Sequence, residues 1–323
     1  MSHPGVEMIS AFLAESGLTT GSVAERRTAM ERIAESAPPP DGVRVETVTL
    51  GGCPAERITP DGDGTDSMVL YLHGGGYCSG SLDSHRQLAS RIALAAASPV
   101  TLLDYRLAPE HPFPAAVTDA TEAYRELLVL GADPRRMAVA GDSAGGGLTV
   151  ATLLALRSRG DPLPAAAVCL SPWVDLTQSA PSYDALADRD PMVTRVGLAE
   201  MAQCYLGGTD PRTELASPLF AADLGRLPPV LIEVGAHEVL LDDATGLADR
   251  IRAAGGSVTF TVWPELIHVF QAFSGDIIPE ADRSIAAVGS FLAEHLGVEA
   301  GPPRERRTGD DVRTGAPRTS GED

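Results

Sequence analysis

A serine inside a glycine-rich turn is the first feature of this sequence that could do covalent chemistry. Ser143 stands in Gly141-Asp-Ser-Ala-Gly145, between the apolar segment 137–141 and a second apolar segment from Gly147 onward. This G-x-S-x-G pattern, between a predicted strand and a predicted helix, is typical of a nucleophile elbow that exposes the serine hydroxyl. In a chain with 33 glycines the alternative is a glycine-rich turn with an uninvolved serine, but the strand–turn–helix context argues against it. We predict that Ser143 is a nucleophile.

Backbone amides that could stabilise an oxyanion follow the predicted strand 68–72. His73-Gly-Gly-Gly76 comes directly after that strand, and without Cβ atoms the N–H groups of Gly75 and Gly76 can approach a tetrahedral intermediate closely. Ala144 would present its N–H at the start of a helix, where the helix dipole favours negative charge. A phosphate-binding loop is the alternative, but neither G-x-G-x-x-G nor Gly-Lys-Ser/Thr is present. We interpret these three amides as an oxyanion hole.

A general base and its acid are expected after the serine, each following a later strand. Of the seven histidines, His268 alone stands on the loop after the last predicted strand, 257–263. Glu238 follows the predicted strand 229–234, where it could orient the imidazole and stabilise its protonated form. Asp242 is the alternative acid, although we expect it in the first turn of the next helix. The sequence therefore predicts a serine–glutamate–histidine triad.

Short apolar strands that alternate with longer helical patterns must position these groups. Strands are predicted at 43–50, 55–58, 68–72, 99–103, 137–141, 165–170, 229–234 and 257–263. Helices are predicted near 8–36, 84–97, 114–130, 144–160, 195–206, 241–254 and 281–296. This alternation predicts an α/β fold, a mostly parallel sheet with helices on both faces, and chemistry beyond the carboxyl ends of its strands.

The chain divides into a catalytic domain with additions. Residues 1–40 are interpreted as N-terminal cap helices, and residues 41–298 as the catalytic domain. A long connection between two predicted strands carries an insertion at about 175–215, which we expect to complete the cap. The tail, 299–323, is rich in Pro, Gly, Arg and Asp with almost nothing apolar, which predicts disorder.

Composition and charge exclude several classes of function. Lys and Arg total 25 against 44 Asp and Glu, and the formal net charge of −19 has the wrong sign for binding nucleic acid. The N-terminus lacks a basic and then apolar signal segment, and no apolar run reaches about 18 residues, so we expect a cytoplasmic protein without membrane contact. The four cysteines form no CxxC pair, so neither a metal site nor a disulfide framework is predicted.

Together these residues resemble the bacterial hormone-sensitive-lipase-like (HSL) esterases of the α/β-hydrolase superfamily, over about 68–296. Further stretches support the likeness, among them Ser81-Leu-Asp-Ser-His85, Tyr105-Arg-Leu-Ala-Pro-Glu110 and Ser171-Pro-Trp173. Where many relatives have Asp-Pro-Leu, this chain has Glu-Val-Leu, which resembles a branch that includes monoterpene lactone hydrolases. The resemblance implies an eight-stranded α/β-hydrolase fold with a helical cap, no cofactor, and the site Ser143, Glu238, His268, Gly75, Gly76 and Ala144.

The resemblance also implies hydrolysis of short- to medium-chain carboxylic esters through an acyl-enzyme on Ser143. The same triad could instead open a lactone or cleave an acylated natural product, and an amidase or peptidase ranks below the esterase. A non-catalytic ligand-binding protein, similar to the plant gibberellin receptors, is a further alternative. Those receptors have lost the histidine that this chain retains at His268. The expected partner is therefore a small-molecule ester or lactone.

Two further expectations concern the surroundings of the site. Many relatives dimerise through the edge of the sheet, so the last predicted strand, 257–263, is the candidate edge for a homodimer. Aromatic and aliphatic residues near the motifs are expected to line the substrate pocket, with ordinary core as the alternative. They are Tyr77, Trp173, Tyr205, Val239, Ile267 and Phe270.

Overall fold

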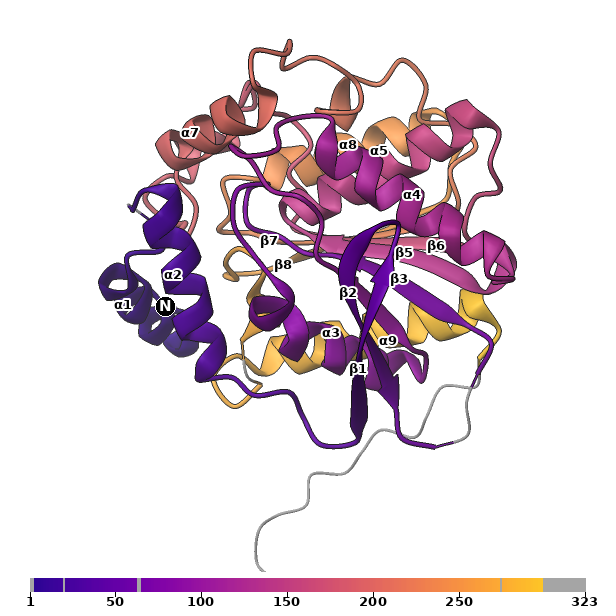
Figure 1. The fold of residues 1–323 in the computed structure, drawn as a ribbon. Helices are drawn as coiled ribbons and strands as arrows, with labels where there is room; N and C mark the ends of the chain where they lie inside the picture. The colour runs from indigo at the N-terminus through magenta and orange to yellow at the C-terminus, as the bar shows by residue number, and fades with distance from the viewer. Residues whose placement is uncertain (1–2, 20, 63–64, 274, 299–323) are drawn as a thin grey trace, which may run out of the picture.

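One eight-stranded sheet forms the centre of the computed structural model, which describes residues 3–19, 21–62, 65–273 and 275–298 (Figure 1). The strand order is β1-β2-β4-β3-β5-β6-β7-β8, with β2 antiparallel to β1 and β4 and the other pairs parallel. The strands are β1 (Val43–Leu50), β2 (Cys53–Pro60), β3 (Met68–Leu72), β4 (Val100–Leu103), β5 (Met137–Asp142), β6 (Ala166–Leu170), β7 (Val230–Gly235) and β8 (Val258–Trp263).

Helices cover both faces of this sheet. Figure 1 shows α3 (Leu82–Ala96) and α9 (Pro279–Leu296) on one face, and α4 (Ala115–Val129), α5 (Ala144–Arg159) and α8 (Leu241–Ala253) on the other. Every residue of β5 and β6 is buried. A parallel sheet covered on both faces requires strands that are apolar throughout, and this is why these strands read as continuous apolar runs.

Three more helices lie together at one side of the sheet, at the left of Figure 1. They are α1 (Pro4–Ser16), α2 (Val23–Glu35) and α7 (Arg195–Leu206). The last belongs to the long connection between β6 and β7, which also holds the short helix α6 (Ser182–Ala185). Single 3-10 turns complete the structure at η1 (Pro134–Arg136), η2 (Pro218–Phe220) and η3 (Phe270–Ala272).

Two adjacent arginines of α2 connect these helices to one another and to the sheet loops. The buried guanidinium of Arg26 donates to the carbonyl oxygen of Gly197 in α7 at 3.4 Å. Arg27 donates to the carbonyl oxygen of Cys78 at 2.7 Å and binds Glu110 through two nitrogens, each at 2.8 Å. The N-terminal helices are therefore fastened both to α7 and to the loop that follows β3.

The predicted fold class is confirmed, and each predicted strand lies within about two residues of an observed one. The helical pattern at 8–36 is two helices, because Gly17 ends the first in a left-handed conformation (φ 77°) and the second begins at Val23. The division into cap and catalytic domain stays a prediction, and the tail 299–323 lies outside the described residues. Within the described residues, every helix is too short or too polar to cross a bilayer.

Candidate active site

Ser143 lies at the sharp turn between β5 and α5. Its backbone has φ 53° and ψ −120°, a conformation that non-glycine residues rarely adopt. A Cβ at Gly141 would collide with the carbonyl oxygen of Leu72, and one at Gly145 would collide with the same oxygen. Because β3 passes so closely, both positions require glycine. The local geometry is that of the predicted nucleophile elbow.

The structure places Glu238 against His268. His268 Nδ1 lies 2.8 Å from Glu238 Oε2, and the glutamate side chain is completely buried. The other oxygen, Oε1, accepts hydrogen bonds from Ser171 Oγ at 2.7 Å and from the Gly235 amide at 2.5 Å. A carboxylate so placed fixes the imidazole as the Nδ1–H tautomer and leaves Nε2 free to act as a base toward Ser143.

Asp242, the alternative acid, is engaged elsewhere. It lies in the first turn of α8, as expected, and its carboxylate accepts the amide of Ser182 at 2.8 Å. The carboxylate next to the imidazole therefore comes from Glu238, in the loop between β7 and α8.

Ser143 and His268 open into one cavity. In the described part of the chain no hydrogen bond joins their side chains directly. Such contacts are often long in unliganded hydrolases and shorten when substrate binds. The serine keeps 8 % of its surface exposed, so a substrate can reach its hydroxyl from the cavity.

The charges around His268 raise its basicity. Burial by itself lowers the pKa of His268, but the hydrogen bond and charge of Glu238, with the charges of Asp190 and Asp142, outweigh burial. The net result is a pKa above the ordinary histidine value of 6.5. An imidazole of this kind accepts the serine proton more readily than a free histidine does.

The glycine-rich loop after β3 reaches the same cavity as Ser143. Gly75 and Gly76 line the cavity and have φ values of 113° and 63°. These values lie in the region that favours glycine. A Cβ at Gly75 would also collide with the carbonyl group of Ser79. Ala144 is the first residue of α5, where its amide has no partner within the helix.

Two residues that hold this loop were not assigned a role from the sequence. The amide of Gly74 donates to Asp142 Oδ1 at 3.1 Å and lies 3.2 Å from His85 Nε2. His85 comes from α3 and also lines the cavity. The only sequence signal for a role of His85 was its place in the stretch Ser81-Leu-Asp-Ser-His85, because the apolar periodicity there predicts nothing more than a helix.

The cavity has a volume of about 520 Å³ and a mostly apolar wall. The wall is built largely by the helices at the side of the sheet, which bring apolar side chains from distant parts of the sequence. They include Met8, Phe12 and Leu13 of α1, Met30 and Ile33 of α2, and Leu198 and Met201 of α7. An apolar ester fits such a wall, whereas a highly charged substrate would lose hydration without compensation.

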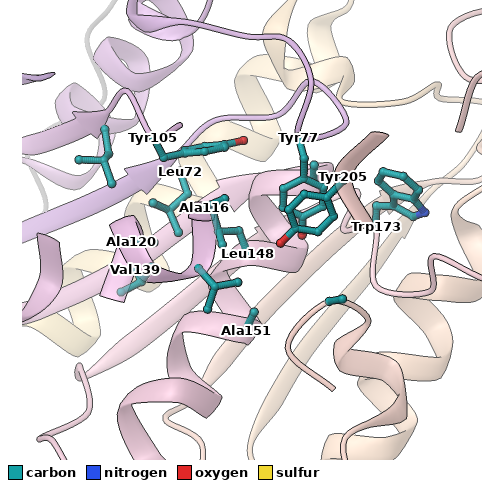
Figure 2. Packing of buried hydrophobic residues seen from close by; sticks show 14 of the residues in the cluster. Leu72, Tyr77, Tyr105, Ala116, Ala120, Val139, Leu148, Ala151, Trp173 and Tyr205 are labelled. Atoms are coloured by element: carbon teal, nitrogen blue, oxygen red, sulfur yellow. The ribbon is translucent and has the colours of Figure 1, made fainter. Parts of the chain in front are cut away.

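The structure corrects the prediction for the pocket wall. Tyr77, Trp173 and Tyr205 are at most 1 % exposed and belong to the core above the sheet. Figure 2 shows the rings of Tyr77 and Tyr205 against each other, and their centroids are 3.8 Å apart. Proximity to a motif in sequence did not place these side chains in the cavity, whose apolar wall comes instead from α1, α2 and α7.

The remaining predicted wall residues are core as well. Val239 is fully buried in the same cluster as Trp173. Ile267 and Phe270 are fully buried and pack with apolar residues of α1. None of the three lines the cavity.

Comparisons with known proteins agree with this geometry. A family model described as the alpha/beta hydrolase fold matches residues 69–272. The chain belongs to this α/β-hydrolase family. An acetyl-hydrolase of Streptomyces hygroscopicus is 45 % identical to this α/β hydrolase over 306 residues, covering 92 % of this chain and 99 % of the relative. The carboxylesterase NlhH of Mycobacterium tuberculosis is 36 % identical, covering 70 % and 74 %.

A solved structure extends the match to three dimensions. A crystal structure of an esterase from the bacterial hormone-sensitive lipase family superposes on this α/β hydrolase with a TM-score of 0.88. The two sequences are 46 % identical, and the match covers 92 % of this chain and all of the other. The family recognised from the sequence motifs is confirmed.

Proposed function

We propose that this α/β hydrolase is a serine carboxylesterase in which Ser143, His268 and Glu238 form the catalytic triad. The observation that carries the proposal is the 2.8 Å contact between His268 and the buried Glu238, in one cavity with the strained Ser143. The named activities of the relatives, acetyl-hydrolase and carboxylesterase, support carboxylic ester hydrolysis. The glycine-rich loop beside the serine supports acyl transfer, since this reaction creates an oxyanion.

In the first half-reaction, Ser143 Oγ attacks the ester carbonyl while His268 Nε2 takes the serine proton. The amides of Gly75, Gly76 and Ala144 stabilise the negative charge on the carbonyl oxygen. The bond to the alcohol then breaks, and His268 gives its proton to the departing oxygen. The product is an acyl-enzyme and a free alcohol.

Water completes the cycle by the same steps. His268 takes a proton from water as its oxygen attacks the acyl-enzyme, and the oxyanion is held again. The bond between the acyl group and Ser143 breaks, and the serine oxygen recovers the proton from His268. Throughout, Glu238 stabilises the imidazolium without taking its proton.

Short- to medium-chain esters are the substrates that the site supports best. The mostly apolar cavity of about 520 Å³ can bury such acyl groups, and the acetyl-hydrolase relative points to the short end of the range. A lactone or an acylated natural product would use the same triad. Activity on such compounds and not on simple esters would therefore identify this alternative substrate class.

The test is hydrolysis of p-nitrophenyl esters from acetate to palmitate by the wild type, Ser143→Ala and His268→Ala. We expect turnover of the shorter esters and a loss of at least about 10³-fold in both variants. A folded wild type that is inert on every ester but opens lactones would support the alternative substrate. Full activity in Ser143→Ala would contradict the mechanism.

We also propose a homodimer through β8. This strand is the last in the sheet order, so one of its edges has no strand beside it among the described residues. Light scattering after size exclusion should give twice the mass of one chain. Val262→Pro should reduce this mass to that of one chain, because the amide of Val262 faces the open edge and not β7. The cytoplasmic location stays a prediction.

A further inference from the structure

Asp190 is a buried carboxylate in the connection that leads into α7. Its side chain is nearly inaccessible, with 5 % of the residue exposed. Oδ1 accepts the amides of Met192 at 3.0 Å and Val193 at 2.9 Å. Oδ2 accepts the amide of Val239 at 3.0 Å, in the residue directly after Glu238. One carboxylate thus joins a loop of the cavity wall to the loop that carries the proposed acid.

Asp190 forms no ion pair: within the described residues, no arginine or histidine lies within ion-pair distance of its oxygens. Burial is the main reason that the pKa of Asp190 is raised to about 6. The charge of His268 opposes this rise, and the charge of Glu238 adds to it. The ionisable groups that act on Asp190 are therefore the two that also form the proposed base and acid.

We propose that Asp190 is a positioning residue of the active site, a second carboxylate that stabilises protonated His268 and holds the loop that bears Glu238. The inference rests on the proposed function, because it assumes that His268 is the base. A carboxylate needed only to shape a turn could lie anywhere on the surface. This one is buried, and it binds the amide directly after the glutamate that contacts His268.

The negative charges of three carboxylates favour protonated His268, and each comes from a different part of the fold. Glu238 follows β7 and makes the hydrogen bond, Asp142 ends β5, and Asp190 precedes α7. Removing Asp190 leaves the other two in place. The base should then remain functional but become less basic, and this effect separates an electrostatic role from a purely structural one.

The test is the pH dependence of kcat/KM for p-nitrophenyl butyrate in the wild type and Asp190→Asn. Loss of one negative charge makes the imidazolium less stable, so the acid limb should move to lower pH. We expect a shift of about 1 pH unit, the lower end of the effect of a neighbouring opposite charge. A loss of folded enzyme that is uniform over this pH range lowers the rate but not the midpoint, and circular dichroism at each pH checks that the folded fraction is constant.

Asp175→Asn is the matched control. Asp175 is also buried, and its oxygens accept the amides of Thr177 and Ser179, but it is not among the carboxylates that act on His268. It should lose stability without moving the acid limb. Asp190→Ser, which keeps one acceptor oxygen, should move the limb as Asp190→Asn does.

An acid limb at the wild-type midpoint in both Asp190 variants would overturn the inference and leave Asp190 a structural residue. A wild type that does not hydrolyse esters, or one whose His268→Ala variant keeps full activity, would instead overturn the proposed function. The two failures are thus distinguishable.

Discussion

At the scale of single residues, the protonation state of His268 controls the activity. The base must be neutral to accept the serine proton, so activity is present above its pKa and is lost as the pH falls through it. Because Glu238, Asp190 and Asp142 together outweigh burial, we expect the midpoint of the acid limb above 6.5. A pH profile of kcat/KM measures this directly, and a rate that stays constant down to pH 4 would exclude His268 as the base.

Glu238 can be tested against a second buried glutamate. Glu238→Gln should reduce kcat by about 10²–10⁴-fold, because an amide can hold the wrong imidazole tautomer and cannot stabilise its charge. Glu233→Gln is the control, since Glu233 accepts hydrogen bonds from Trp263 and Gln271 instead. Steady-state kinetics should show little change in the control, whereas equal losses in both variants would point to a general effect of buried charge.

At the scale of elements, the close approach of β3 and α5 positions the nucleophile. Gly145→Ala should lower stability by roughly 1–3 kcal/mol, because the new Cβ would meet the backbone of Leu72 and His73. Gly246→Ala in α8 should instead stabilise by about 0.5–1 kcal/mol, since its Cβ meets only the flexible end of Leu219. Chemical denaturation measures both, and an effect of the same sign in the two variants would contradict this packing.

The elements of the sheet could be predicted because their signals are local. Strands β5 and β6 are continuous apolar runs bounded by turn residues, and the elbow glycines follow from the tight turn itself. The cavity wall could not be predicted in this way. It depends on α1 packing against the loop after β8 and on α2 binding α7 and the loop after β3. No local pattern in residues 8–36 predicts where those helices lie. Asp190 was missed for the same reason, since its partner Val239 is 49 residues away.

At the scale of the whole molecule, a buried acid contributes to the response of stability to pH. Burial raises the pKa of Asp243 to about 8, whereas an ordinary aspartate has 3.8. Between these values the folded state holds a proton on Asp243 that the unfolded state releases, so the contribution of Asp243 to the free energy of unfolding falls as the pH rises from about 4 to about 8. Thermal melts should show a smaller decrease of Tm over this range in Asp243→Asn, and an identical decrease would exclude Asp243 as its cause.

Rapid quenching tests most directly whether the acyl group passes through Ser143. The enzyme is mixed with p-nitrophenyl butyrate, quenched with acid within the first turnovers, digested and analysed by mass spectrometry. We predict a butyryl group on the peptide that contains Ser143, and none on that peptide from Ser143→Ala. Turnover without any acylated peptide, or acylation of another residue, would contradict the proposed mechanism.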